Sequence, residues 1–208
     1  MSYTKQKILN ESKKLFFEVG IANTRLQQIA DASSMSIGNL AYHFKNKESI
    51  VEAAYENLFD ELSNILAKYI TNSPLQAIDE LFTGLYHFYD NNRFTFNNIW
   101  EIERNHPLIQ EQWLSVNRKI LQQVSSKLLS SQKLDLLKEE QFKGQINMIS
   151  NNLHVIIIFW LPQRFTQNQQ VSERLFKKNL WSILYPFLTV RGQENFHQNI
   201  NSKYFLDF

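Results

Sequence analysis

Apolar residues recur at intervals of three and four along most of the chain, the spacing that places them on one face of an α-helix. Only five glycines and four prolines interrupt this pattern. So few breakers leave little opportunity to turn a strand, so long helices are expected and a multi-stranded sheet is not. The sequence therefore predicts an all-α fold of about nine helices. Six of them follow the first 46 residues, over about 47–69, 75–91, 94–104, 107–131, 139–161 and 171–189.

The first 46 residues predict three shorter helices. One runs from Thr4 to Gly20, which is placed to end it. Thr24, three residues before Gln27, has the spacing of a capping box that starts a second helix. Ser33 and Ser34 interrupt that helix, and Ser36 can cap a third one that continues to Phe44. Two short helices separated by a tight turn form a helix-turn-helix.

The residues of this segment resemble the signature of the tetracycline-repressor (TetR) family, T-x4-I-A-x5-S-x-G-x-L-x3-F-x2-K-E. The resemblance covers about residues 4–60. It implies an N-terminal three-helix DNA-binding domain, residues 1–47, and a helical ligand-binding and dimerisation domain, residues 48–208. The matching positions are Thr24, Ile29, Ala30, Ser36, Gly38, Leu40, Phe44, Lys47 and Glu48.

The chain departs from the family pattern in and after the turn. Ser34 stands where the family usually has glycine, so the turn must accept a side chain, and Met35 replaces the usual valine. Ala41 stands where a tyrosine commonly touches a phosphate. Tyr42 and His43 follow it, and the phosphate contact is expected to move to them.

The motif places one face of the third helix in the major groove of operator DNA, where side chains read base edges. Arg25 and Lys47, each at the start of a helix, are expected to bind phosphates. For Tyr42 and His43 the alternative is partial burial against the first helix. The residues expected to contact bases are Ser36, Ile37, Asn39, Tyr42 and His43.

Charge supports a polyanionic partner for the N-terminal segment. Residues 1–47 carry a net charge of +4, whereas the remainder carries −2. A basic segment joined to a slightly acidic body suits double-stranded DNA bound by the segment alone. The alternative is an ordinary solvated face.

The last two predicted helices carry more apolar surface than a monomer easily hides. In TetR-like proteins this pair forms a four-helix bundle with its twin, so a homodimer is expected. The residues expected at its interface are Leu153, Ile156, Trp160, Leu180, Ile183 and Phe187.

Aromatic residues concentrate in the middle of the chain and suggest a cavity for a small apolar or aromatic effector. The alternative is a plain aromatic core. His87, Asn97, Glu101 and Asn152 are candidate polar contacts. The expected lining is Phe82, Tyr86, Phe96, Trp100 and Trp113.

Composition and motifs argue against other classes. Hydrophobic residues make up 43% of the 208 and charged residues 20%, a globular composition without cysteine. The polar N-terminus predicts no export signal, and the apolar run 153–161 is shorter than the roughly 20 residues of a membrane span, so a cytoplasmic, nucleoid-associated protein is expected.

An enzyme is the competing class, and Glu103 with His106 is its best site. No Walker loop, Gly-x-Ser-x-Gly or glycine-rich dinucleotide motif accompanies that pair. We therefore expect no catalytic residues, cofactor or metal. Control by a protein partner is the other alternative. The sequence leaves open the effector, the operator, the regulated genes, the sign of control and the role of the tail after Arg191.

Overall fold

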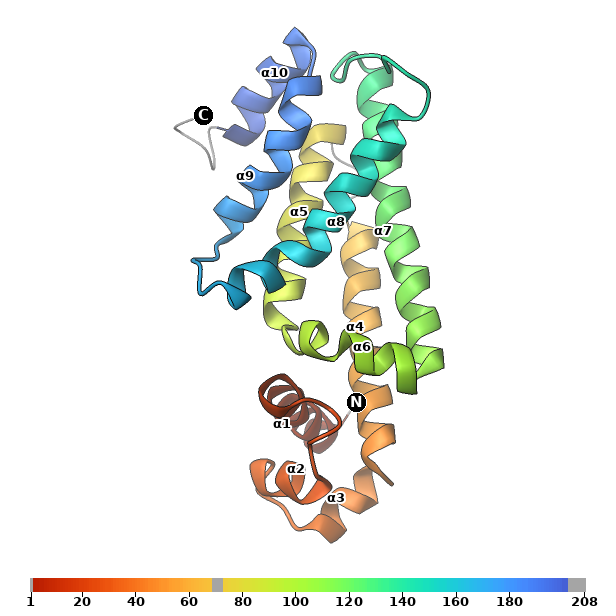
Figure 1. The fold of residues 1–208 in the computed structure, drawn as a ribbon, viewed down its shortest axis with the longest axis vertical. Helices are drawn as coiled ribbons and strands as arrows, with labels where there is room; N and C mark the ends of the chain where they lie inside the picture. Colours follow the sequence, from red (N-terminus) through yellow and green to blue (C-terminus); the bar gives the residue numbers. More distant parts are fainter. Residues whose placement is uncertain (1, 69–72, 202–208) are drawn as a thin grey trace. The chain divides into compact units, whose positions relative to one another are not determined.

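The computed structural model describes residues 2–68 and 73–201, and within this part the fold is all-α, as predicted (Figure 1). Leu137 and Leu188 form an isolated antiparallel bridge. A 3-10 turn, Tyr185–Phe187, follows α9, and a π-helical turn, His197–Asn201, follows α10. The α-helices are α1 Tyr3–Val19, α2 Leu26–Ala32, α3 Ile37–His43, α4 Lys47–Lys68, α5 Pro74–Asn91, α6 Phe94–Asn105, α7 Pro107–Lys133, α8 Gln145–Thr166, α9 Glu173–Leu184 and α10 Val190–Phe196.

The chain forms two compact units. The first contains residues 1–61 and 91–115, and the second contains residues 62–90 and the chain from 116 onward. The first unit is larger than the expected DNA-binding domain of residues 1–47, because α6 packs against α1. A boundary inside α4 separates the two units along one continuous helix.

The core of the first unit is built from the inward faces of α1 to α4 and α6. Its α1–α3 part lies together at the red and orange end of the ribbon (Figure 1). Even the seven-residue helices α2 and α3 contribute fully buried apolar side chains, and this packing explains why such short helices are stable here. The fully buried apolar side chains of this core include Ile8, Phe16, Ile29, Leu40, Ile50 and Leu58.

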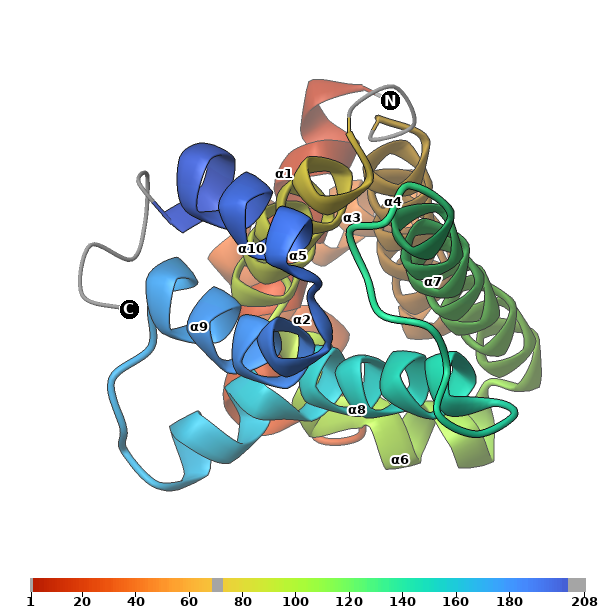
Figure 2. The same ribbon diagram turned by 90° about the horizontal axis from the view of Figure 1, so that it is seen from above.

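The core of the second unit surrounds α5, and 11 of the 18 residues of this helix are buried. The Phe82 ring meets Trp181 of α9 edge-on at 6.2 Å between centroids, and Trp160 of α8 meets Phe176 at 5.5 Å. Helices α8 and α9 lie side by side (Figure 2). A buried ion pair also joins α5 to α9, between Lys177 Nζ and Asp79 Oδ2 at 2.7 Å.

Helix α8 starts and ends later than the predicted range 139–161. It begins after Gly144, which has a positive φ of 88°, and the Glu140 carboxylate accepts the Ile146 N–H at 2.7 Å. Pro162 was expected to break the helix but lies inside it. Burial of Trp160 and Leu161 holds the helix on the core across the missing backbone hydrogen bond.

The predicted helix 171–189 is divided by the 3-10 turn, and α10 follows. Thr189 caps α10 by accepting the Gly192 N–H at 3.0 Å. Phe196 and Ile200 are buried, and the Phe196 ring packs on Trp181 at 4.8 Å. The segment after Arg191 therefore packs in the second unit as far as residue 200, whereas the tail residues from Tyr204 to Phe208 lie outside the described part.

Candidate nucleic-acid interface

The start of α3 is fixed by the side chain of Ser36, the residue just before the helix. Ser36 Oγ accepts the Asn39 backbone N–H at 3.2 Å, which confirms the predicted cap. This bond satisfies one of the N–H groups that a helix leaves without a partner at its start. Leu40 is fully buried on the inward face, so the opposite face of α3 is turned to solvent.

The predicted capping box of Thr24 and Gln27 is wrong, and the one that forms lies one residue later. The Arg25 backbone N–H donates to Gln28 Oε1 at 2.8 Å. Thr24 is buried, and its hydroxyl donates to the Gly20 carbonyl at 2.7 Å. Gln27 is exposed and donates to Asp31 Oδ1 at 2.8 Å. The turn before α2 draws Thr24 inward, away from the cap position.

The turn between α2 and α3 requires a left-handed residue. Ser34 has φ 57°, the conformation for which the family usually supplies glycine. The Ser34 N–H donates to the Asp31 carbonyl at 3.0 Å, and the Met35 N–H donates to the Ala30 carbonyl at 3.0 Å. The turn therefore forms with a side chain present, at the cost of left-handed backbone strain.

Replacing Ser34 by glycine is expected to raise the free energy of unfolding by up to about 1 kcal/mol, because glycine removes the left-handed strain but loses more entropy on folding. Urea denaturation of the wild-type and Ser34→Gly proteins measures this. Ser34→Ala is the control, since it keeps Cβ and gains nothing. A Ser34→Gly protein less stable than wild type would show that the left-handed conformation of Ser34 does not destabilise the protein.

The face of α3 opposite Leu40 is turned to solvent, as base reading requires. Tyr42 is 85% exposed and Ile37 47% exposed. Ser36 and Asn39 are exposed as well. Burial of Tyr42 against the first helix is therefore wrong.

His43 lies beside Tyr42 and is half-buried. The two rings meet edge-on, with 5.2 Å between their centroids. Only part of the His43 side chain is therefore available to solvent or to a ligand.

The two cations expected to bind phosphate differ in their surroundings. Arg25 is exposed. Lys47 is half-buried, and its Nζ donates to the Ile21 carbonyl at 2.8 Å and to the Ala22 carbonyl at 3.1 Å. Lys47 thus ties the start of α4 to the turn between α1 and α2.

Sequence reasoning missed Asn98, a buried residue of α6 that contacts the same turn. Its Oδ1 accepts the Ile21 N–H at 2.9 Å. The only sequence signal is its position between Phe94 and Ile102, at four-residue spacing, which makes it a polar residue within an apolar stripe. The neighbouring Asn97, which the sequence suggested as a polar contact of an effector cavity, has a side chain outside the described part.

The residues expected to line an effector cavity come from both compact units, and a common cavity stays a prediction. Phe82 and Tyr86 belong to the second unit, where Tyr86 packs on Phe176 at 5.6 Å. Trp113 belongs to the first unit and packs on Phe59 at 6.2 Å. The side chains of Phe96 and Trp100 lie outside the described part.

The candidate polar contacts of that cavity are described only in part. His87 Nε2 lies 3.2 Å from Glu173 Oε2 in the second unit. Asn152 is exposed on α8, and the Glu101 side chain lies outside the described part.

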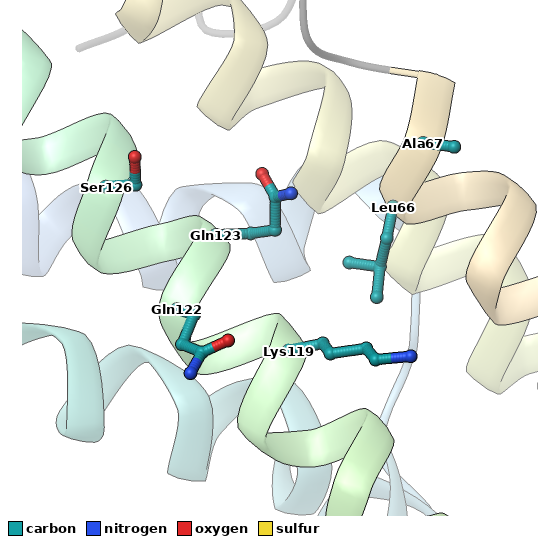
Figure 3. A pocket seen from close by; sticks show the side chains of 6 residues that line it. All are labelled: Leu66, Ala67, Lys119, Gln122, Gln123 and Ser126. Carbon is teal, nitrogen blue, oxygen red and sulfur yellow. The ribbon is translucent and has the colours of Figure 1, made fainter.

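A groove of about 360 Å³ within the second unit has a different lining from the predicted one (Figure 3). Gln123 and Lys119 of α7 face Leu66 of α4 across it. A second groove of about 420 Å³ within the first unit runs along Glu48, Glu52 and Glu56 of α4. Neither is lined by the predicted aromatic residues.

Half of the residues expected at the dimer interface are buried within the chain itself. Leu153, Trp160 and Leu180 lie in the core of the second unit, whereas Ile156, Ile183 and Phe187 are half-buried. Helix α8 is apolar around much of its circumference, so its sequence does not reveal which side faces inward. The exposed apolar side chains of α8 are Met148, Val155 and Phe159.

The described residues form neither a membrane span nor a metal site. None of the helices among residues 2–68 and 73–201 combines the length and apolar character needed to cross a bilayer. Within the same residues, His, Asp and Glu side chains do not gather in groups of three or more that suit a metal ion.

Comparison with known proteins places this geometry in a family. Residues 8–54 match the model of bacterial regulatory proteins of the tetR family, and residues 59–196 match that of a bacterial transcriptional repressor. The biofilm operon icaADBC negative transcriptional regulator IcaR of Staphylococcus aureus is 27% identical over 189 residues, 88% of this chain and 98% of that protein.

Solved structures show the same fold. A TetR-family regulator from Marinobacter aquaeolei superposes with a TM-score of 0.81 and 19% identity, over 98% of this chain and 99% of that chain. A SmeT–triclosan complex gives a TM-score of 0.60 and 18% identity, over 91% and 93%. SmeT is the repressor of a multidrug efflux pump of Stenotrophomonas maltophilia. With family models matching most of its length, the chain belongs to the TetR family of bacterial DNA-binding transcription regulators and is not an enzyme.

Proposed function

We propose that the protein is a cytoplasmic repressor that binds operator DNA as a homodimer, inserts α3 into the major groove and is released by a small effector. The observation that carries the DNA-binding mode is the two-sided character of α3, with Leu40 buried and Ile37, Asn39 and Tyr42 exposed. Repression is supported by the repressor model over residues 59–196 and by the negative regulator IcaR.

Asn39 and Arg25 carry the two kinds of DNA contact in this proposal. An asparagine amide can donate and accept at the same time, which suits the N6 and N7 edge of adenine, and Ile37 suits a thymine methyl group. Arg25, exposed at the start of α2, contacts a phosphate and fixes the position of the helix-turn-helix on the duplex. Ser36, Tyr42 and His43 complete the contact surface.

Dimerisation brings two copies of α3 to successive turns of the duplex. Its support is the apolar stripe of α8, where Met148, Val155 and Phe159 are exposed. Ile156, Ile183 and Phe187 of the expected interface are half-buried. Apolar stripes of this kind on a soluble domain mark protein–protein interfaces.

A small apolar or aromatic effector is supported by the triclosan held by SmeT, a protein of the same fold. The second candidate is control by a protein partner. It is favoured by the packing of Phe82 and Tyr86, which are buried against Trp181 and Phe176 instead of lining an open cavity.

The DNA-binding mode is tested on duplexes that the wild-type protein selects from a random-sequence library, titrated over a series of salt concentrations. Asn39→Ala is expected to weaken DNA binding by about 1–3 kcal/mol per half-site and to relax the base preference at one symmetric pair of duplex positions. The salt slope, which is the slope of the logarithm of the binding constant against the logarithm of the salt concentration, should stay unchanged. Arg25→Ala is expected to weaken all duplexes alike and to lower the slope by about two for the dimer.

Lys133→Ala is the charge-matched control, because Lys133 is exposed at the end of α7 in the second unit. It should change neither affinity nor slope. Loss of salt slope without loss of base preference in Asn39→Ala would show that Asn39 binds phosphate, and the base-reading role would pass to Ile37 or Tyr42.

A further inference from the structure

The turn between α1 and α2 is held by side chains from two other helices, and both act on one residue. The Ile21 N–H donates to Asn98 Oδ1 of α6 at 2.9 Å, and the Ile21 carbonyl accepts Lys47 Nζ of α4 at 2.8 Å. Ile21 itself is buried. All of these residues belong to the first compact unit.

Asn98 uses both ends of its amide to hold the end of α1. Its Nδ2 donates to the Phe16 carbonyl at 3.0 Å and to the Phe94 carbonyl at 2.6 Å. Helix α1 stops at Gly20, whose φ of 83° turns the chain away and leaves the last carbonyls of the helix in need of donors. Only a side chain with an acceptor and two N–H donors satisfies all three groups, and Asn98 is 1% exposed.

Lys47 holds the same turn between α1 and α2 from α4. Besides the Ile21 carbonyl, its Nζ donates to the Ala22 carbonyl at 3.1 Å. Hydrogen bonds from a charged donor are stronger than neutral ones, so this contact favours one conformation of the turn. The turn leads directly into Arg25 and α2, and through α2 into α3.

We propose that Asn98 and Lys47 are positioning residues of the helix-turn-helix, which hold it in the DNA-binding geometry through Ile21, and that Lys47 serves this purpose instead of binding phosphate. The inference rests on the DNA-binding mode proposed above. Rigid placement of α2 and α3 lowers the ordering cost of binding, and its loss weakens binding to DNA that neither side chain touches.

Hydrogen exchange of the free protein tests, without DNA, whether Asn98 holds the turn between α1 and α2. In Asn98→Ala, the Ile21 amide loses its acceptor and should exchange faster, whereas the amides of Ile29 and Leu40 should keep their protection. In Asn98→Asp, which retains the acceptor and loses the donors, the Ile21 amide should stay more protected than in Asn98→Ala. Thr95→Val is the matched control, because the buried Thr95 hydroxyl bonds only within its own segment, to the Asn92 carbonyl at 2.9 Å.

Titration of the selected duplexes tests the consequence. Asn98→Ala and Lys47→Met should each lower affinity by about 5- to 150-fold, the usual range of coupling between sites, with the salt slope of wild type. Their effects should be less than additive in the double variant, since both act through Ile21. Thr95→Val should bind as wild type, and Arg25→Ala supplies the slope expected of a lost phosphate contact.

The possible outcomes separate this inference from the proposed function. A fall in salt slope in Lys47→Met as large as that in Arg25→Ala would make Lys47 a phosphate ligand and overturn the inference. Unchanged Ile21 protection and unchanged affinity in Asn98→Ala would overturn it as well. Failure of the wild-type protein to select any duplex would count against the proposed function, whereas the exchange result would still decide whether Asn98 holds the turn.

Discussion

Replacing Asp79 by alanine is expected to lower the free energy of unfolding by about 3–5 kcal/mol, because it removes the nearest counter-charge of a buried ammonium group. Another carboxylate oxygen, Glu173 Oε1, lies farther from Lys177 Nζ, at 3.7 Å. Lys177 is fully buried, and its Nζ lies 2.7 Å from Asp79 Oδ2. Asp79 Oδ1 accepts the Trp181 Nε1–H at 2.9 Å, so the substitution also removes the partner of a buried indole. Burial raises the pKa of the Asp79 carboxyl, and Lys177 opposes that rise.

Urea denaturation of the two proteins measures the loss. The double variant Asp79→Leu with Lys177→Met is the control, because an apolar pair of similar volume often replaces a buried ion pair at little cost. Recovery of only part of the lost stability is expected in the double variant, because the Trp181 Nε1–H still lacks its acceptor. A loss below about 1 kcal/mol in Asp79→Ala, the level of a surface ion pair, would show that Lys177 finds another partner or reaches water.

Replacing Gly192 by alanine is expected to lower the free energy of unfolding by about 3 kcal/mol or more. The added methyl group would press on backbone atoms, which cannot move aside as a flexible side chain can. A Cβ at position 192 would lie 1.9 Å from the Leu136 carbonyl oxygen. The same contact region joins the α7–α8 loop to the start of α10, where the Thr189 N–H donates to the Leu136 carbonyl at 3.2 Å and the Thr189 hydroxyl donates to the Asp135 carbonyl at 2.6 Å. In the Gly192→Ala protein, we therefore expect the added methyl group to push α10 away from the α7–α8 loop.

Calorimetry of the wild-type and Gly192→Ala proteins gives the loss as a shift in Tm. Gly38→Ala is the matched control, because Gly38 is helical and its Cβ would meet only Ser36 Oγ, at 4.0 Å. That variant is expected to gain up to about 1 kcal/mol from helix propensity. Equal shifts in the two glycine variants would mean that the contact with Leu136 relaxes and that conformational freedom alone sets the effect.

Much of the fold was predictable because helices are specified by local rules. The three- and four-residue periodicity gave α5, α6 and α7 nearly at their observed bounds. The cap by Ser36 and the position of the turn at Ser34 depend on residues within one or two helical turns, so they too followed from the sequence. Membership of the TetR family rests on the same local pattern.

The errors arose where another contact overrides the preference of the residue itself. Thr24 had the residue type and the spacing of a cap, but its hydroxyl bonds to Gly20 and Arg25 takes the cap position. Pro162 had the chemistry of a helix breaker, but α8 continues past it because Trp160 and Leu161 are held in the core.

The sequence by itself determined the all-α fold, the order of the helices and the face of α3 that is turned to solvent, since periodicity, capping and turn chemistry act between near neighbours. The tertiary structure alone decided which side of α8 is buried, because apolar residues occur around much of this helix and do not mark its inward face. It also decided the contacts of Asn98 and Lys47. Asn98 bonds to Ile21 across 77 positions and Lys47 across 26, and no spacing rule links residues so far apart in the chain.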